Sequence, residues 1–390
     1  MTFDLTSSEY HTIQKVRAHD MEIQAMVTTN EKDFEKQTLL LDDPKADEVL
    51  VKIVASGVCH TDATVLDGTL PVPRPALLGH EGSGIVVKAG SNVTTVQEGD
   101  HVVLGFAYCG HCHNCLDGNA GGCENMIPLN FSGRNKHNET PIHTHDHQDV
   151  SQFFGQSSFG TYATVDEKNV VKVDKETDLR YLGPFGCGLM TGSGTVLNSL
   201  APAPGTSFVV FGTGAVGLSG LMAAKIAGCN PIIAVDIHDS RLELAKELGA
   251  THVINSKHEN PAEKVKEITE GKGAHYSFET TGVPEVTLAA LHCLRVKGTC
   301  ATVAVGKRDL TFNVTNDLML NALTLKGVIE GDAVPQLFIP KLVKFFKNGQ
   351  FPVEKLAKFY ELEEIEQAFE DSKNGSTIKP ILILDKEYRA

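Results

Sequence analysis

Apolar and polar positions change their pattern along the chain. Between residues 26 and 182, apolar stretches such as 47–59 (DEVLVKIVASGVC) and 82–104 are short and are separated by glycine-rich turns. This pattern predicts short strands joined by tight turns, as in a small barrel. Residues 68–81 (GTLPVPRPALLGHE) hold too much proline for regular structure. The first part of the chain is therefore expected to be β-rich.

A different pattern begins near residue 202 and continues to residue 331. Apolar runs alternate there with helical segments, in the order SFVVFG, PIIAVD, THVIN, AHYSFETTG, GTCATVAVG and LTLKGVI. Alternating strands and helices predict a parallel sheet with helices on both faces. Residues 334–350 and 362–375 have two further helical patterns, and a strand is expected at 379–384 (KPILIL).

The composition restricts the partners. The formal net charge is −14, and an acidic surface repels phosphate backbones, so we expect no nucleic acid partner. No apolar run approaches the roughly 20 residues that cross a bilayer, and residues 1–22 lack the apolar core of a signal peptide. The nine cysteines, an odd number, favour metal binding in a reducing compartment over disulfides. We therefore expect a cytoplasmic protein without a membrane partner.

A glycine-rich loop follows the first strand of the alternating region. Gly212-x-Gly214-x-x-Gly217 comes directly after an apolar strand and opens a helix, and the next strand ends in Asp236. This is the βαβ context of a dinucleotide site, in which the helix N-terminus binds the pyrophosphate. A carboxylate at Asp236 would accept hydrogen bonds from the ribose hydroxyls and repel a 2′-phosphate. The loop therefore predicts NAD rather than NADP.

Four cysteines gather in the stretch CGHCHNCLDGNAGGC, with the spacing CxxCxxCx7C. Four thiolates close a tetrahedral zinc site and leave no position for substrate. The stretch therefore predicts a structural zinc rather than a catalytic one. The four predicted ligands are Cys109, Cys112, Cys115 and Cys123. Two histidines between them, His111 and His113, leave a shell of three cysteines and one histidine as the alternative.

A second candidate metal site is dispersed along the chain. Cys59, His80 and Cys187 each lie beside glycine or small residues at a strand end or turn. Together they supply two thiolates and an imidazole, which leaves the fourth zinc position for water or substrate. Asp62 and Glu81 lie beside these ligands and are candidates to hydrogen-bond the imidazole or tune the metal.

Residues 134–152 are polar and contain four histidines. We interpret them as a solvated loop, because the stretch offers no apolar anchor, with a further metal site as the alternative.

Five motifs occur in the order found in zinc-dependent medium-chain alcohol dehydrogenases: GVCHTD, GHEGSGIV, CGHCHNCLDGNAGGC, GCG…TG and GTGAVG…D. The chain resembles this family over residues 26–388. Within that family, residues 153–163 (FFGQSSFGTYA) and 183–200 (GPFGCGLMTGSGTVLNSL) are most similar to the aryl-alcohol branch. The first twenty-odd residues have no recognised counterpart.

The resemblance implies an α/β fold with two domains. A GroES-like, β-rich catalytic domain would comprise residues 1–186 and 332–390, with 1–25 as an extra N-terminal segment. A doubly wound Rossmann domain that binds NAD would comprise residues 187–331.

The resemblance also implies roles for individual residues. Cys59, His80 and Cys187 would be the catalytic zinc ligands, and Thr61 would take the proton of the alcohol. The implied cofactor contacts, beside the glycine loop and Asp236, are His60, Thr191, Val216, Arg241 and Lys379. One departure is Thr64, which stands where liver-type members have the histidine that ends the proton relay, so the proton exit stays open.

The resemblance implies an enzyme that interconverts a primary alcohol, here a benzyl-type one, and its aldehyde, with NAD and two zinc ions per chain, as a homodimer or homotetramer. Aliphatic alcohols, polyols and S-hydroxymethylglutathione are alternative substrates, and a non-catalytic NAD-binding protein is a remote alternative. Phe106, Phe131, Phe153 and Phe154 could line an aromatic pocket or fill the core.

Overall fold

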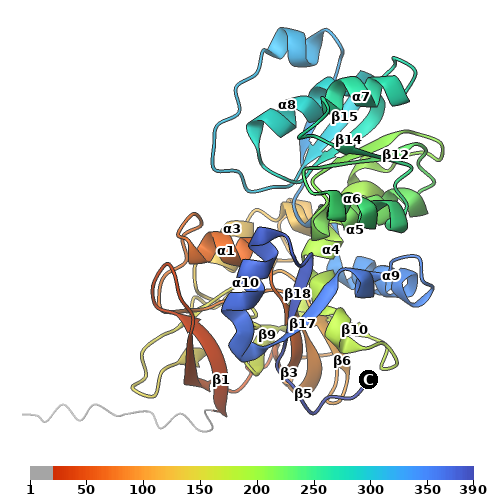
Figure 1. The fold of residues 1–390 in the computed structure, drawn as a ribbon. Helices are drawn as coiled ribbons and strands as arrows, with labels where there is room; N and C mark the ends of the chain where they lie inside the picture. The colour runs from red at the N-terminus through yellow and green to blue at the C-terminus, as the bar shows by residue number, and fades with distance from the viewer. Residues whose placement is uncertain (1–20) are drawn as a thin grey trace, which may run out of the picture.

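The computed structural model describes residues 21–390, which form three β-sheets and the helices around them (Figure 1). Two sheets of five and seven strands build the β-rich lower body, and a sheet of six strands lies in the upper body. Residues 1–20, most of the expected extra segment, lie outside the described residues.

The five-stranded sheet has the order β7-β2-β1-β4-β8. Its strands are β1 (Met21–Thr28), β2 (Glu35–Leu41), β4 (Ala76–Leu77), β7 (Ile142–His143) and β8 (Ser151–Gln152). Strand β1 pairs antiparallel with β2 from its first residue, Met21 opposite Leu41. Residues 21–25, expected within the extra segment, therefore belong to the sheet.

The seven-stranded sheet has the order β10-β6-β5-β3-β18-β17, with β9 also paired to β3. Its strands are β3 (Glu48–Gly57), β5 (Gly82–Ala89), β6 (His101–Leu104), β9 (Tyr162–Asp166), β10 (Val170–Val173), β17 (Ala357–Glu361) and β18 (Lys379–Ile383). Because β18 lies antiparallel to β3, the end of the chain returns to the β-rich body.

The six-stranded sheet is parallel and has the order β13-β12-β11-β14-β15-β16. Its strands are β11 (Phe208–Phe211), β12 (Ile232–Asp236), β13 (His252–Asn255), β14 (Ala274–Glu279), β15 (Leu294–Thr302) and β16 (Thr324–Gly327). The central strands are almost continuously apolar and buried, as in a sheet covered on both faces. The predicted parallel sheet is confirmed, and its order reverses direction between β11 and β14, where ligands bind in such folds.

Helices cover both faces of the parallel sheet, and others pack around the lower body (Figure 1). They are α1 (His60–Leu66), α2 (His113–Leu116), α3 (Met126–Phe131), α4 (Gly188–Gly194), α5 (Ala215–Ile226), α6 (Asp239–Leu248), α7 (Pro261–Ile268), α8 (Pro284–His292), α9 (Pro335–Lys347) and α10 (Ile365–Asn374). Within residues 21–390, no helix combines the length and apolarity needed to cross a bilayer.

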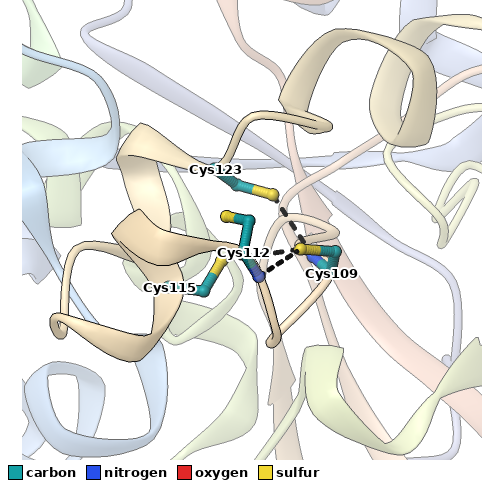
Figure 2. A group of neighbouring side chains, drawn as sticks. All are labelled: Cys109, Cys112, Cys115 and Cys123. Atoms are coloured by element: carbon teal, nitrogen blue, oxygen red, sulfur yellow. Dashed lines mark hydrogen bonds between the residues drawn. The ribbon is translucent and has the colours of Figure 1, made fainter.

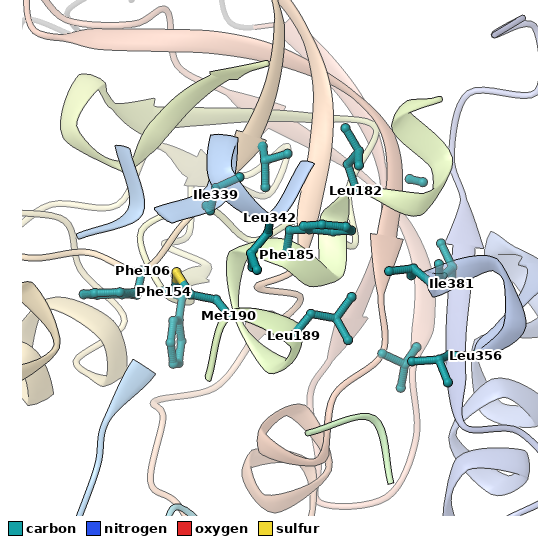
Figure 3. Packing of buried hydrophobic residues seen from close by; sticks show 14 of the residues in the cluster. Phe106, Phe154, Leu182, Phe185, Leu189, Met190, Ile339, Leu342, Leu356 and Ile381 are labelled. Atoms are coloured by element: carbon teal, nitrogen blue, oxygen red, sulfur yellow. The ribbon is translucent and has the colours of Figure 1, made fainter. Parts of the chain in front are cut away.

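A buried apolar cluster holds α4, the helix that begins after Cys187, against its surroundings (Figure 3). Leu189 and Met190 of α4 are buried in the same cluster as Ile339 and Leu342 of α9. Burying a side chain of this size stabilises the fold by about 1.5–3 kcal/mol. The position of Cys187 is therefore set by the packing of this core.

The histidine-rich segment differs from the expectation of a solvated loop. Ile142 and Val150 are buried and provide the apolar anchors that the sequence reading missed. His143 is also buried, with Nε2 3.3 Å from Asp42 and Nδ1 3.2 Å from Asp149. The solvated-loop interpretation is therefore wrong for this part of the segment. The only metal-capable groups found among the described residues are the two that the sequence predicts.

Candidate active site

A cavity of about 1260 Å³ is lined by residues of both bodies. Most of the predicted site residues line it: Cys59, His60, Thr61, Cys187, Thr191, Gly212, Gly214, Val216, Gly217, Asp236, Arg241 and Lys379. His80, Asp62 and Glu81 are fully buried and are not part of its lining. The cavity thus joins the glycine loop to the dispersed cysteines.

The dispersed metal candidates converge at one end of this cavity. One donor atom each from Cys59, His80, Cys187 and Glu81 lies within 4.8 Å of all the others. Nε2 of His80 is buried and has no hydrogen-bond partner in the described part of the chain. The pKa of the Cys59 thiol lies well below its ordinary value. The main cause is a hydrogen bond from Cys187, which lowers this pKa, whereas burial acts in the opposite direction. The thiols of Cys59 and Cys187 and the unpartnered imidazole nitrogen of His80 are the kinds of ligand that zinc prefers, so these residues fit a zinc ion.

One carboxylate holds two of these ligand segments together. Asp62 Oδ2 accepts the backbone N–H of Cys59 at 3.1 Å, which closes the first turn of α1. Asp62 Oδ1 accepts from Gly79 N at 3.1 Å and from Nδ1 of His80 at 3.0 Å. The contact fixes the orientation of the His80 ring and leaves Nε2 directed at the thiols.

A buried ion pair braces the same site. Lys379, the first residue of β18, donates to both carboxylate oxygens of Glu81 at 3.0 and 2.9 Å and to the carbonyl of Val58 at 3.1 Å. Burial raises the pKa of Glu81. Burial lowers the pKa of the Lys379 amine, but the charges of Glu81 and Cys59 and the hydrogen bonds to Glu81 together raise it above its ordinary value. Glu81 also accepts from Gly188 N at 3.1 Å. The three donors of Lys379 are thus engaged with protein, so its contribution to the cavity is its charge.

The α1 helix gives His60, Thr61 and Thr64 different surroundings. The hydroxyl of Thr61 lies on the cavity wall, 3.8 Å from the sulfur of Cys59. His60 is exposed on the same wall. Thr64 is buried, and its hydroxyl donates to the Thr61 carbonyl at 2.8 Å, so it does not reach the cavity.

The glycine loop has the space that a dinucleotide needs. Gly212 has φ +88°, a left-handed conformation that glycine adopts without strain. A Cβ at Gly217 would come within 1.8 Å of the Gly212 carbonyl, so helix and strand pack only because it is absent. A Cβ at Gly214 would meet nothing within 4 Å, which leaves the N-terminus of α5 open to an anion.

Asp236 ends β12 beside this loop. It accepts from the backbone and hydroxyl of Thr213, both at 2.7 Å, and from the backbone of Ile237 and His238. Although burial acts in the opposite direction, these hydrogen bonds lower the pKa of Asp236. Arg241 lines the same region, and its buried Nε has no hydrogen-bond partner within residues 21–390. Both side chains line the cavity, and Arg241 keeps a donor there without a partner among the described residues.

The four clustered cysteines form a separate centre (Figure 2), and none of them lines the cavity. Their four sulfur atoms lie within 4.8 Å of one another. The sulfur of Cys109 accepts from the backbone of Cys112 at 3.3 Å, and that of Cys123 accepts from the backbone of Cys109 at 3.3 Å. His111 instead bonds a backbone carbonyl. This geometry favours the four-cysteine shell over the alternative with histidine.

An apolar wall extends from the Cys59 end of the cavity. Leu70, Met126, Ile127, Phe131 and Phe154 line it. Phe106 and Phe153 do not: both are fully buried. Of the four phenylalanines named as alternatives between pocket and core, two therefore face the cavity and two fill the core.

Sequence reasoning missed one acidic side chain in the site. Glu330, three residues after β16, lines the cavity with 8% of its surface exposed. The hydroxyl of Thr191 donates to it at 3.3 Å, and its other oxygen lies 3.8 Å from the sulfur of Cys187. Burial raises the pKa of Glu330 to about 7. The only signal in the sequence is an acidic residue just beyond an apolar strand.

Comparison with known proteins identifies the family. Residues 45–175 match the alcohol dehydrogenase GroES-like domain, and residues 215–348 match the zinc-binding dehydrogenase family. The chain is 42% identical to a geraniol dehydrogenase of Castellaniella defragrans over 87% of its own length and 91% of that protein. The chain therefore belongs to the zinc-dependent alcohol dehydrogenases and is an oxidoreductase with a GroES-like and a Rossmann part.

Two solved structures are similar over nearly the whole chain. A benzyl alcohol dehydrogenase from Acinetobacter calcoaceticus has a TM-score of 0.89 and 48% identity, covering 94% of this chain and 100% of its own. An alcohol dehydrogenase zinc-binding domain protein from Burkholderia ambifaria has a TM-score of 0.91 and 47% identity with the same coverage.

Proposed function

We propose that the chain is an NAD-dependent alcohol dehydrogenase that interconverts primary aromatic alcohols and their aldehydes. The observation that carries this proposal is the juxtaposition of Cys59, His80 and Cys187 with an apolar wall in one cavity that also contains the glycine loop. We further propose that the Rossmann domain comprises residues 187–331.

Each residue of the site would have a distinct role in the reaction. Cys59, His80 and Cys187 would hold zinc, and Asp62 keeps the imidazole in its ligating orientation. When bound, zinc supplies a Lewis acid for the alcohol oxygen and NAD supplies the hydride acceptor. The hydroxyl of Thr61 lies on the cavity wall beside Cys59, where it can accept the proton of the alcohol.

Asp236 supports NAD as the cofactor. Its carboxylate is held ionised beside the loop, and a 2′-phosphate placed there would be repelled. We expect Asp236→Gly to raise the ratio of kcat/KM with NADP to that with NAD by about tenfold or more. Steady-state kinetics with both cofactors measure this ratio. A wild-type preference for NADP would contradict the assignment.

The apolar wall supports an aromatic or allylic substrate. A ring can pack against Phe131 and Phe154, with aromatic pairs worth about 0.5–1.5 kcal/mol beyond burial. We expect benzyl alcohol and allylic alcohols such as geraniol to lead, long primary alcohols to follow, and ethanol and polyols to be poor. The test is kcat/KM with NAD for benzyl alcohol, geraniol, ethanol and a polyol. Equal values, or a lead for ethanol or the polyol, would reject the aromatic substrate.

A matched pair of variants links that preference to the wall. Phe131→Leu changes a ring that faces the cavity, whereas Phe153→Leu changes a ring of the core in contact with it, 5.9 Å between centroids. Only the first should lower the ratio of kcat/KM for benzyl alcohol over a long primary alcohol, by about three- to tenfold. A loss of equal size in both variants would assign the effect to core packing.

We also propose that the chain forms a homodimer or homotetramer. Strand β16 ends the parallel sheet, and the described residues leave its outer edge unpaired. Val296 in the neighbouring strand, and Met319 and Leu320 just before β16, are exposed apolar side chains. An open edge with apolar neighbours favours pairing between subunits. Sedimentation velocity tests this assembly, and a monomer would contradict it. The cytoplasmic location stays a prediction.

A further inference from the structure

Glu330 lies where the reacting part of a dinucleotide must come. The proposed function requires hydride transfer beside Cys59, His80 and Cys187, so the nicotinamide must reach from the glycine loop to that end of the cavity. Glu330 contacts Cys187 and Thr191 there and lines the same cavity. Its carboxylate is therefore a neighbour of any ring placed for the reaction.

The backbone directs this side chain inward at a cost. Glu330, Gly331 and Asp332 have φ values of +50°, +66° and +47°, and two of the three are not glycine. A left-handed residue of this kind is strained and persists only where the surroundings enforce it. Asn198 donates to the Gly331 carbonyl at 3.1 Å, and Lys326 pairs with Asp332 at 3.0 Å.

Close packing on α4 also enforces the turn. A Cβ at Gly331 would come within 2.5 Å of the Met190 carbonyl, so the loop fits against the helix only with glycine at this position. The turn after β16 is therefore fixed by contacts on both sides, and Glu330 is presented to the cavity by a rigid loop.

Of the described carboxylates at this end of the cavity, Glu330 is the one that lines the cavity and lacks a cationic partner. Two thiolates would offset one zinc ion, and Glu81 is paired with Lys379. No cationic side chain within residues 21–390 forms an ion pair with Glu330, whose carboxylate is hydrogen-bonded by the Thr191 hydroxyl and the Cys187 thiol. The oxidised nicotinamide ring carries a positive charge, whereas the reduced ring carries none. A neighbouring carboxylate distinguishes the two rings more strongly in a buried site than in water, because the local dielectric constant is lower.

We propose that Glu330 selects the redox state of the cofactor: its carboxylate faces the nicotinamide and stabilises the oxidised ring relative to the reduced one. This inference rests on the proposed NAD-dependent function. It states that NAD⁺ binds more tightly relative to NADH than it would with an uncharged side chain at position 330. The bound enzyme is thereby biased toward the state that accepts hydride from an alcohol.

The test compares dissociation constants of the zinc-loaded full-length protein for NADH, followed by nucleotide fluorescence, and for NAD⁺, followed by competition. In buffer well above neutral pH, Glu330→Gln should raise the ratio of the NAD⁺ to the NADH constant about tenfold, while the NADH constant changes by less than about twofold. Glu330→Asp keeps the charge and should retain most of the wild-type ratio. Glu330→Ala serves the same comparison should the glutamine variant fail to fold.

Asp332→Asn is the matched control, because Asp332 lies in the same left-handed turn and does not line the cavity, and the amide oxygen of asparagine can still accept from Lys326. It should leave the ratio unchanged. A purely structural role of Glu330 would weaken both nucleotides together. An unchanged ratio in Glu330→Gln with normal NADH binding would overturn this inference alone. Failure of the wild type to bind either nucleotide would reject the proposed function and this inference with it.

Discussion

The two cysteine centres differ in how the chain builds them. The centre formed by Cys109, Cys112, Cys115 and Cys123, the cysteine lobe, comes from fifteen consecutive residues. Its sulfur atoms are oriented by backbone N–H groups of the same loop. It lies outside the cavity.

The second centre comes from three segments that only the fold brings together. Cys59 and Cys187 are each the residue before a helix, and His80 immediately precedes Glu81 and β5. Its orientation depends on Asp62 and on packing of α4 rather than on its own loop. A locally closed centre can stabilise a lobe, whereas a dispersed one on a cavity wall can change ligands during a reaction.

The largest effect is expected from Cys59→Ser. Losing one of three ligands should remove the metal from the cavity and lower kcat/KM by at least about a thousandfold. The thermal midpoint should change little, because Asp62 and the α4 core remain in place. Kinetics with benzyl alcohol and thermal unfolding measure both effects. A variant that keeps normal activity would show that Cys59 holds no catalytic metal.

The converse variant is Cys112→Ser in the cysteine lobe. Here the chemistry should survive and the stability should fall, by several kcal/mol, because metal binding contributes directly to folding of such a loop. Thermal unfolding together with activity of the remaining folded protein checks this. Cys229→Ser, a buried cysteine outside both centres, is the control for the substitution itself. Equal stability in Cys112→Ser and wild type would remove the distinction between the centres.

An intermediate effect is expected from Asp62→Asn. The variant removes the charge that faces His80 and should weaken zinc at the cavity about 10- to 100-fold without affecting the lobe. Chelator competition resolves the two metals by their rates of loss. Asp67→Asn is the control, since Asp67 follows the same helix but pairs with exposed Lys307 at 2.7 Å. Faster loss of lobe zinc in Asp62→Asn would argue that the centres are not independent.

The smallest effect is expected at Thr64. Its hydroxyl bonds the helix backbone and does not reach the cavity, so Thr64→Val should lower kcat by less than about threefold. Thr61→Ala should lower it by about a hundredfold or more, because this hydroxyl faces the reacting end. pH–rate profiles of both variants provide the comparison. A large loss in Thr64→Val would place the proton path through that residue.

The contrast between the centres also explains what could be predicted from the sequence. The cysteine spacing and the glycine loop are local signals, because their geometry is set by a few consecutive residues. The parallel arrangement of the upper sheet follows from strand–helix alternation, whereas the order of its strands does not. Residue types and glycine-rich settings make Cys59, His80 and Cys187 a candidate site, but their assignment as ligands of one catalytic zinc comes from the family resemblance, since nothing in the local pattern brings Cys59 to Cys187.

The missed features depend on contacts between distant segments. Glu330 faces the cavity because Gly331 packs on α4 and the turn is left-handed, and neither feature is visible in the order of residues. Lys379 is held by Glu81, 298 positions earlier in the chain. His143 is buried because a short strand pairs with β2. These three side chains take their environment from the fold rather than from their neighbours in sequence.

The most direct test of two independent centres is the zinc content of the purified protein and its two cysteine variants. Elemental analysis should find about two zinc ions per chain in the wild type and about one in each of Cys59→Ser and Cys112→Ser. Only Cys112→Ser should keep dehydrogenase activity. A single zinc in the wild type, or the loss of both from Cys59→Ser, would contradict the account.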